Sequence, residues 1–290
     1  MSDLKKILNR PEEDTYQVLL PACGDWGARV YPKVRLADVL PIEGSGIPDD
    51  SFSYALKSHF DFLAVDEKNL PLFAIEFDGP LHEEATQAAR DSLKDALCDR
   101  FELPLLRINS RYLEKKYRDL DLLSWFVQVW FLRKGFYEAQ EKGAVPYDED
   151  FDPFMFFSLP GYKQRFPLWI SAPSNIAIQK LAKAGKLLSP APSLIVSRDL
   201  RGRYRALGYV FVDRAFAVCC ETGMKTQRFD VSESEILSEI VICELYEGIK
   251  AWLLGKGSLM EAAQVDSLIG RYEKEYTLLR AATCGTRGRS

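Results

Sequence analysis

Three acidic residues, Asp61, Glu76 and Asp78, are spaced so that all three can act on one ligand. Asp61 and Glu76 belong to two apolar segments, residues 60–65 and 72–77, which a short polar connection separates, and Asp78 directly follows the second segment. Such a pattern is typical of two strands joined in a hairpin. If the turn is symmetric, Asp61 lies opposite Glu76, and alternation along the strand places Glu76 and Asp78 on one face.

These carboxylates would repel one another on a strand pair whose other side chains are apolar. Opposed like charges destabilise a sheet, and burying an unpaired carboxylate is costly or raises its pKa. A divalent cation removes this cost, because Mg²⁺ binds carboxylate oxygens and retains waters for a substrate phosphate. The trio therefore predicts a Mg²⁺ or Mn²⁺ site at which a metal-bound water attacks a phosphate. The alternative is that the three acids face water at strand ends as ordinary surface charges.

The elements that position these acids follow from the hydrophobic pattern. We expect a first helix over residues 11–22 and an extended segment over residues 29–40, before the two strands. Both strands are apolar on both faces, which is typical of the centre of a layered α/β sheet. A helix over residues 83–101 and a strand over residues 104–108 come next. The helical pattern of residues 110–142 is too long for one unbroken helix.

The 290 residues are enough for two domains of ordinary size. We expect a domain with the acids over residues 1–143, a proline-containing acidic linker over 144–160, and an α+β domain over 161–290. Residues 1–150 carry 19 Lys and Arg against 28 Asp and Glu, a net charge of −9. The rest carries 19 against 14, a net charge of +5, so the second domain suits nucleic acid better.

Composition excludes several classes of protein. The longest strongly apolar stretch, residues 122–132, is too short to span a membrane, and the charged N-terminus has no signal-peptide segment. We therefore expect a cytoplasmic protein that does not contact a membrane. The six cysteines form no CxxC pair and only two histidines are present, which argues against a structural zinc site.

Longer runs around the acids resemble a known superfamily. They are residues 58–63, 74–82 and 104–108 with Asp91 between them, preceded by Glu13, Tyr16, Leu20 and residues 34–40. In order and spacing these runs resemble the PD-(D/E)XK nuclease superfamily, in an uncharacterised bacterial branch (DUF2726-like) related to very-short-patch-repair-type endonucleases. The resemblance covers about residues 10–110. It implies a restriction-endonuclease-like core, a mixed central sheet flanked by helices, which hydrolyses phosphodiester bonds with Mg²⁺ or Mn²⁺.

The resemblance assigns Asp61 to the first metal-binding acid and Glu76 to the second. The superfamily's usual lysine, two residues after the second acid, is Asp78 here, and an acid is typical of this branch. Another side chain must then orient or activate the attacking water.

Lys94 is our candidate for a relocated lysine, and it shares one helical stripe with Gln87 and Asp91. The alternative is that Lys94 pairs with Asp91 or Asp95 on a solvated face of that helix.

Other side chains are candidates near the acids. His82 titrates near neutrality and can donate a proton or contact a phosphate, or it caps the following helix. Glu13 is expected to reach the metal from the first helix, with Glu12 as the alternative, although a first-turn acid also suits the helix dipole. Arg107 ends a strand, where it either binds a phosphate or pairs with one of the acids.

The second domain contributes a cluster of arginines at a predicted hairpin turn between strands over residues 194–197 and 204–212. The cluster consists of Arg198, Arg201, Arg203 and Arg205. Basic hairpin tips can grip a nucleic-acid backbone, and the alternative is a solvated turn whose arginines pair with neighbours. A further hairpin is expected from residues 215–220 and 227–231.

These patterns predict a metal-dependent nuclease that acts on nucleic acid, with DNA favoured over RNA. The runner-up is an inactive protein of the same fold that binds nucleic acid or protein in a repair or defence system, because the motif lysine is absent. A third interpretation is a scaffold that presents the aromatic segment 110–142. In each case the C-terminal domain is a possible contact for a protein partner.

Overall fold

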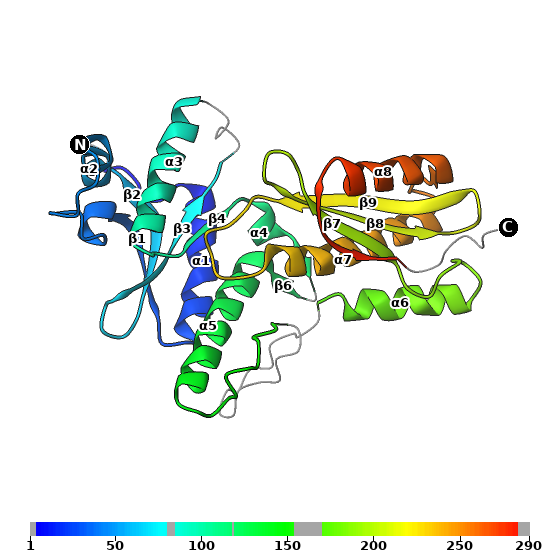
Figure 1. Cartoon of the computed structure of the whole chain (residues 1–290), viewed down its shortest axis with the longest axis horizontal. Coiled ribbons are helices and arrows are strands. Elements are labelled where there is room, and N and C mark those ends of the chain that lie inside the picture. The colour runs from blue at the N-terminus through cyan, green and yellow to red at the C-terminus, as the bar shows by residue number, and fades with distance from the viewer. Residues whose placement is uncertain (1–3, 80–84, 118, 154–169, 284–290) are drawn as a thin grey trace. The chain divides into compact units, whose positions relative to one another are not determined.

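The computed structural model of the protein describes residues 4–79, 85–117, 119–153 and 170–283. The chain forms two compact units (Figure 1). The first unit combines Met1–Pro153 with a distant short segment, Gln227–Val231, which we call the return segment. The second combines Phe154–Thr226 with Ser232–Ser290. The first unit thus takes residues from both halves of the sequence.

The first unit is built on a mixed sheet of order β1-β2-β3-β4 (Figure 1). Its strands are β1 (Arg29–Arg35), β2 (His59–Val65), β3 (Pro71–Phe77) and β4 (Leu105–Ile108). β1, β2 and β3 pair antiparallel, as the short β2–β3 connection requires, whereas β4 pairs parallel to β3. Helix α3 (Ala85–Arg100) provides the crossover that a parallel pair needs.

Aromatic side chains pack one face of this sheet against α1 (Arg10–Gly24) and α5 (Leu122–Glu141). Tyr16 of α1 stacks on Phe62 of β2, with ring centroids 5.9 Å apart. Phe73 of β3 meets Trp130 of α5 edge to face at 4.8 Å. Such pairs add to the stabilisation that burial of their large apolar area already gives, so α5 belongs to the core of the first unit.

The other face of the sheet is covered by α2 (Asp49–Lys57), α3 and the short 3-10 helix η1 (Leu36–Asp38). Their apolar side chains form one buried cluster with those of β2, β3 and β4. Both faces of β2 and β3 are therefore covered, as the doubly apolar strands predicted. The 3-10 turn lies within residues 29–40, which the sequence pattern assigned to an extended segment, and α2 was not predicted.

The predicted break in the helical pattern of residues 110–142 is confirmed. The segment forms a short helix, α4 (Arg111–Glu114), and a two-stranded pair, β5 (Lys116–Tyr117) with β6 (Leu120–Asp121), before α5 begins. Asp121 caps α5, because its carboxylate accepts hydrogen bonds from the backbone N–H and the hydroxyl of Ser124.

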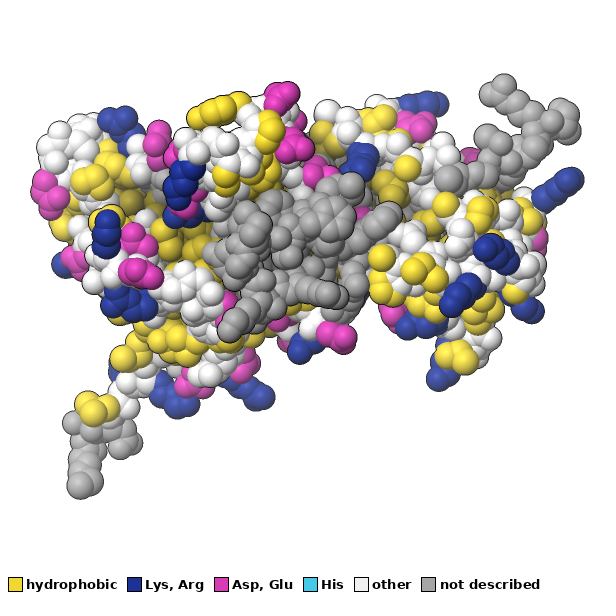
Figure 2. All heavy atoms as spheres, turned by 90° about the horizontal axis from the view of Figure 1, so that it is seen from below, with side chains coloured by type: hydrophobic (Ala, Val, Ile, Leu, Met, Phe, Trp, Pro, Cys, Tyr) yellow, Lys and Arg dark blue, Asp and Glu magenta, His cyan; other side chains and the backbone are white. Residues whose placement is uncertain are grey.

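The second unit is α+β, with a sheet of order β10-β9-β8-β7-β11. The strands are β7 (Ser193–Arg198), β8 (Tyr204–Phe211), β9 (Phe216–Met224), β10 (Met260–Glu261) and β11 (Thr277–Ala282). Among the described residues of this unit, three helices accompany the sheet: α6 (Ala172–Lys183), α7 (Glu233–Leu253) and α8 (Ala262–Lys274). Lys and Arg side chains are spread among hydrophobic ones on the face of this unit seen in Figure 2.

One predicted hairpin is correct and the other is wrong. β7 and β8 pair across a turn that includes Asp199 and Gly202, as expected. Residues 227–231, however, do not pair with β9. They form the return segment of the first unit, where Arg228 makes a single bridge to Leu105 of β4. Among the described helices, none is long and apolar enough to cross a membrane.

Candidate active site

The β2–β3 hairpin places Asp61 beside Glu76, as predicted. The pairs Phe62 with Ile75 and Leu63 with Ala74 follow the symmetric register, and one irregularity appears near Val65 at the turn. The backbone N–H of Asp61 donates to Oε1 of Glu76 over 3.2 Å. The two carboxylates therefore occupy neighbouring positions at one end of the strand pair.

Asp61 is held on both of its oxygens. Its Oδ2 accepts from the backbone N–H of Phe77 at 2.9 Å, and its Oδ1 accepts from Nζ of Lys33 at 2.7 Å. Lys33 also donates to Oε1 of Glu12 at 2.9 Å. Hydrogen bonds to Asp61 and Glu12 raise the pKa of Lys33 despite its partial burial, which has the opposite effect. A charged ammonium group therefore joins the acid of α1 to the acid of β2.

Lys33 has an unusual backbone conformation, with φ at +55° in the left-handed region. Few residues other than glycine adopt this region, and such strain tends to persist where surrounding contacts impose it. Lys33 lies in β1 between Pro32 and Val34, whose partners in β2 are Phe62 and Phe60. This register puts Lys33 across from Asp61, the residue to which it is hydrogen-bonded.

Glu76 and Lys94 form a buried ion pair. Nζ of Lys94 donates to Oε2 of Glu76 at 2.6 Å and to the backbone oxygen of His59 at 2.8 Å, and each side chain belongs to a residue only 7% exposed. Burial raises the pKa of Glu76 to about 7, Lys94 lowers it, and the neighbouring Asp61 raises it. Additional positive charge beside Glu76 would therefore favour the ionised form of its carboxyl group.

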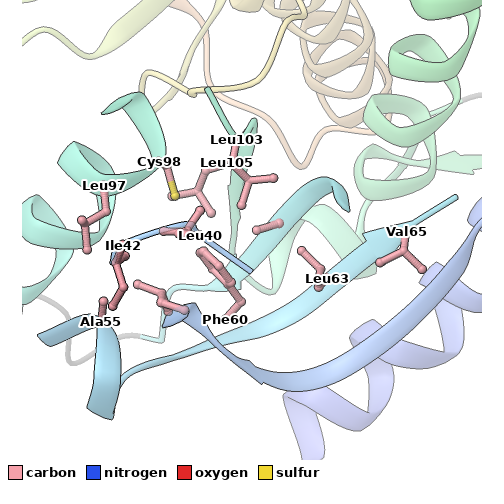
Figure 3. Close-up of a cluster of buried hydrophobic side chains, with 12 residues drawn as sticks. Leu40, Ile42, Ala55, Phe60, Leu63, Val65, Leu97, Cys98, Leu103 and Leu105 are labelled. Carbon is pink, nitrogen blue, oxygen red and sulfur yellow. The ribbon is translucent and has the colours of Figure 1, made fainter. Parts of the chain in front are cut away.

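The apolar surroundings explain this burial. Figure 3 shows Leu97 and Cys98 of α3 in one buried layer with Phe60 of β2 and Leu105 of β4. Lys94 lies one helical turn before this layer, and its ammonium group is 5.8 Å from the centroid of the Phe60 ring. α3 therefore packs by its apolar stripe and delivers one lysine to the end of the sheet.

Asp78 has a different partner, Arg107 of β4. Nη1 of Arg107 lies 3.0 Å from Oδ1 of Asp78 and 3.3 Å from Oδ1 of Asp91, and Nη2 lies 2.9 Å from Oδ1 of Asp95. Burial alone would lower the pKa of Arg107, but Asp95 and Asp78 raise it above its ordinary value. Arg107 is consequently a fixed cation that three acids share.

The return segment forms hydrogen bonds with the backbone of Arg107 and with its acidic neighbours. Oε1 of Gln227 accepts from the backbone N–H of Arg107 at 2.8 Å, and Nε2 of Gln227 donates to the backbone oxygen of Arg107 at 3.1 Å. Arg228 donates to Asp95 at 2.7 Å and to Asp99 at 2.8 Å. Residues 120 or more positions away in the sequence therefore complete the surroundings of this arginine.

Two of these carboxylates are candidate ligands for a divalent cation. Within the described ranges, no three His, Cys, Asp or Glu side chains form a group that can hold a metal ion. Mg²⁺, however, is commonly bound by only one or two carboxylates together with waters and substrate phosphates. One oxygen of each carboxylate accepts a hydrogen bond from a backbone N–H group. The other oxygens, Oδ1 of Asp61 and Oε2 of Glu76, each accept from a lysine. A metal ion would compete with Lys33 and Lys94 for them.

An open depression of about 820 Å³ begins at these residues. Asp61, Lys33 and Lys94 line its inner part, and α2 and α3 contribute further walls. The remaining lining residues are Asp50, Ser53, Tyr54, Lys57, Ser58, His59, Arg90, Asp91 and Leu93. The candidate site therefore opens to solvent on the α2–α3 side of the sheet.

Several predicted site residues occupy other positions than expected. Glu13 points away from the site and pairs with Lys6, with 46% of its side chain exposed. Glu12, the alternative, faces the sheet because it is one helical step further round α1. Lys94 is buried against Glu76, and the pairing with Asp91 or Asp95 on a solvated face is wrong.

Arg107 is paired with acids, as one of the two interpretations held. Its side chain is only 9% exposed, so we no longer assign it to phosphate binding. His82 and the side chain of Gln87 lie outside what the structure describes. The sequence interpretation missed Lys33, although its place opposite Asp61 follows once β1 and β2 are aligned.

The arginine cluster of the second unit is partly tied to neighbours. The carboxylate of Asp199 accepts from the backbone N–H groups of Arg201 and Arg203, and from Nε of Arg205 at 3.0 Å. Arg198 donates to the hydroxyl of Tyr204 at 2.6 Å and lies over its ring. Arg201 remains exposed at the tip of the turn. The turn is therefore ordered by Asp199, and Arg198 and Arg201 are both exposed.

Residues 4–121 match a family described as "Protein of unknown function (DUF2726)". No curated protein and no solved structure matches the chain significantly. The matched region contains β1 to β4 and every residue of the Asp61–Glu76–Lys94 group, but not the return segment.

Proposed function

We propose that the first unit is a restriction-endonuclease-like domain that hydrolyses phosphodiester bonds of nucleic acid with Mg²⁺ or Mn²⁺. One observation carries this proposal: Lys94 brings an ammonium group within 2.6 Å of Glu76, which itself lies beside Asp61. Two acids and a lysine are thereby assembled at a strand end although position 78 lacks the motif lysine. DNA is the first substrate to test.

Each residue of this group has a chemical role in the proposal. Asp61 and Glu76 would hold the ion, which lowers the pKa of a bound water and offsets negative charge on the phosphate. Lys94 orients the attacking water or stabilises negative charge that develops beside Glu76. Lys33 positions Asp61, and Arg107 holds Asp78 away from the reacting atoms. In the metal-free protein burial raises the pKa of Glu76 to about 7, so binding of the ion near neutral pH would be coupled to loss of the Glu76 proton.

A second candidate function is a nucleic-acid-binding module without catalysis. It is favoured by the charge balance of the site, because Asp61, Glu76 and Asp78 each already contact a lysine or arginine. A site whose acids are paired in this way does not require a metal ion for its stability. Metal binding and cleavage therefore separate the two candidates.

The test combines metal-dependent melting with cleavage. Wild type, Asp61→Asn, Glu76→Gln and Lys94→Met are melted with EDTA, Mg²⁺ or Mn²⁺, and incubated with plasmid DNA, single-stranded DNA and RNA. Asp38→Asn is the matched control, because Asp38 is an acid of the same unit that pairs with exposed Arg35.

The nuclease proposal expects metal to raise the melting temperature of wild type and Asp38→Asn but not of Asp61→Asn. It also expects cleavage to be lost in the three site variants. Binding of nucleic acid without metal stabilisation or cleavage would instead support the second candidate. Cleavage at the wild-type rate by Lys94→Met would remove the lysine from the mechanism.

A further inference from the structure

The depression beside Asp61 has the size of a ligand site and a distinctive lining. Its volume of about 820 Å³ falls within the range of about 300–1,000 Å³ that is usual for ligand pockets. Tyr54 and Leu93 contribute apolar surface, while Lys57 and Arg90 contribute charge from α2 and α3. Such a mixture suits a ligand that has both anionic and apolar parts.

The cations that line this depression fall into two groups. Lys33 and Lys94 are already held by Glu12, Asp61 and Glu76. Lys57 and Arg90 are exposed, and within the described part of the chain neither has an ion-pair partner. The outer wall of the depression therefore offers two positive charges to an anion from solvent.

The acids of the depression do not cancel these two charges directly. Asp91 lies 3.3 Å from Nη1 of Arg107, and Oδ1 of Asp50 accepts from the backbone N–H of Ser51. Asp61 contacts Lys33. An anion that enters the depression beside Lys57 and Arg90 thus meets two positive charges that have no ion-pair partner among the described residues.

We infer that Lys57 and Arg90 bind a backbone phosphate of a nucleic-acid strand, next to the phosphate that is cleaved at Asp61 and Glu76. This inference rests on the proposed function. A strand carries a phosphate at every nucleotide, and contacts to neighbouring phosphates fix its register and orientation. Tyr54 supplies a ring against which a sugar or an unpaired base packs. The depression thereby selects a strand rather than an isolated phosphate.

Binding is measured without cleavage, by fluorescence anisotropy of a labelled single-stranded oligonucleotide in EDTA over a range of salt concentrations. The test variant is the double mutant Lys57→Ala/Arg90→Ala. The matched control is Lys134→Ala/Lys250→Ala, which also removes two positive charges, from exposed lysines that pair with Glu138 and Glu247. Circular dichroism melting checks that each protein is folded.

The inference expects the test variant to bind about tenfold more weakly and to reduce the log–log salt slope by about 0.7, the value for one lost phosphate contact on a single strand. The control should bind within about twofold of wild type. Wild-type affinity in the test variant, or an equal loss in the control, would overturn it. A mononucleotide or inorganic phosphate that competes as well as the oligonucleotide would show that a free anion is the ligand, and would also overturn it.

Failure of this inference is distinguishable from failure of the proposed function. Binding that depends on Lys57 and Arg90, in a protein that cuts no substrate with any metal, supports the pocket and rejects the nuclease. Metal-dependent cleavage with binding that is indifferent to both residues rejects the pocket and supports the nuclease.

Discussion

Replacing Glu76 by glutamine should remove a pH-dependent loss of stability from the metal-free protein. Glu76 is 7% exposed, and burial raises its pKa from 4.5 to about 7. The folded chain therefore holds the proton of this carboxyl group more tightly than the unfolded chain. The stabilisation from Glu76 is complete below pH 4.5 and is lost as the pH rises through about 7.

The size of the effect follows from the two pKa values. A rise from 4.5 to about 7 corresponds to about 3 kcal/mol, since one pKa unit is worth about 1.4 kcal/mol. Glutamine has nearly the shape of a protonated glutamate and does not titrate. The unfolding free energy of Glu76→Gln minus that of wild type should therefore grow by about 3 kcal/mol between pH 4.5 and 7.5, and level off above.

Urea unfolding in EDTA at half-unit pH steps measures this difference. Subtracting the two unfolding free energies cancels the contributions of the other titrating groups, which both proteins share. The same series with Mg²⁺ should show a smaller change for wild type, because a bound cation favours the ionised carboxylate. A difference that is constant with pH would refute the reasoning. It would mean that Lys94 outweighs burial and that Glu76 is ionised throughout, as in an ordinary ion pair.

Three further predictions concern the neighbours of Glu76. Arg107→Met should lower the unfolding free energy by about 3–5 kcal/mol in urea, because Asp78 and its fellow acids lose their cation, and a loss below about 1 kcal/mol would show that these acids are hydrated. Phe229→Ala should cost about 3–5 kcal/mol in the same assay, because the ring packs against Phe73, and unchanged stability would show that the return segment is dispensable. Lys33→Met should lower the Mg²⁺ concentration that half-stabilises the protein in thermal melts, because Asp61 loses a competitor, and a higher concentration would show that Lys33 assists metal binding.

The arrangement of Asp61 and Glu76 was accessible from the sequence because hairpin register is a local property. Two apolar strands and a short polar turn fix which residue of one strand lies opposite which residue of the other. The observed pairs follow that symmetry up to Ala64. Helices α1 and α3 followed from their own periodicity, whereas α2 was not predicted. Lys94 shares a helical stripe with Asp91, and the hydrophobic pattern allows a lysine there to be either solvated or buried. Only packing decides that its ammonium group turns inward.

Other parts of the site depend on contacts that a pattern does not contain. The difference between Glu12 and Glu13 is one helical step of α1, and both residues are equally suited to the first turn. Lys33 takes a left-handed conformation that no feature of the Pro32-Lys33-Val34 sequence indicates. These contacts arise only when α1, β1 and β2 are assembled.

The return segment shows the same limit over a longer distance. Phe229 and Val231 alternate with polar residues, as in a strand, and this pattern fits pairing with either sheet of the protein. In the structure Phe229 packs among Phe73, Phe126 and Trp130 of the first unit. An apolar site of the right shape therefore decided the partner, and that site is formed by residues about 100–160 positions earlier.

This long-range closure has a consequence for the order in which the protein is made. All four strands of the first sheet have been synthesised by residue 108, yet backbone groups of Leu105 and Arg107 bond to residues 227 and 228. Translation adds about 5–20 residues per second, so roughly 6–24 seconds pass between the synthesis of β4 and the synthesis of these partners. An unpaired strand edge invites pairing with other chains. Nascent chains, and fragments cut after residue 153, should therefore self-associate through β4 unless another protein covers it.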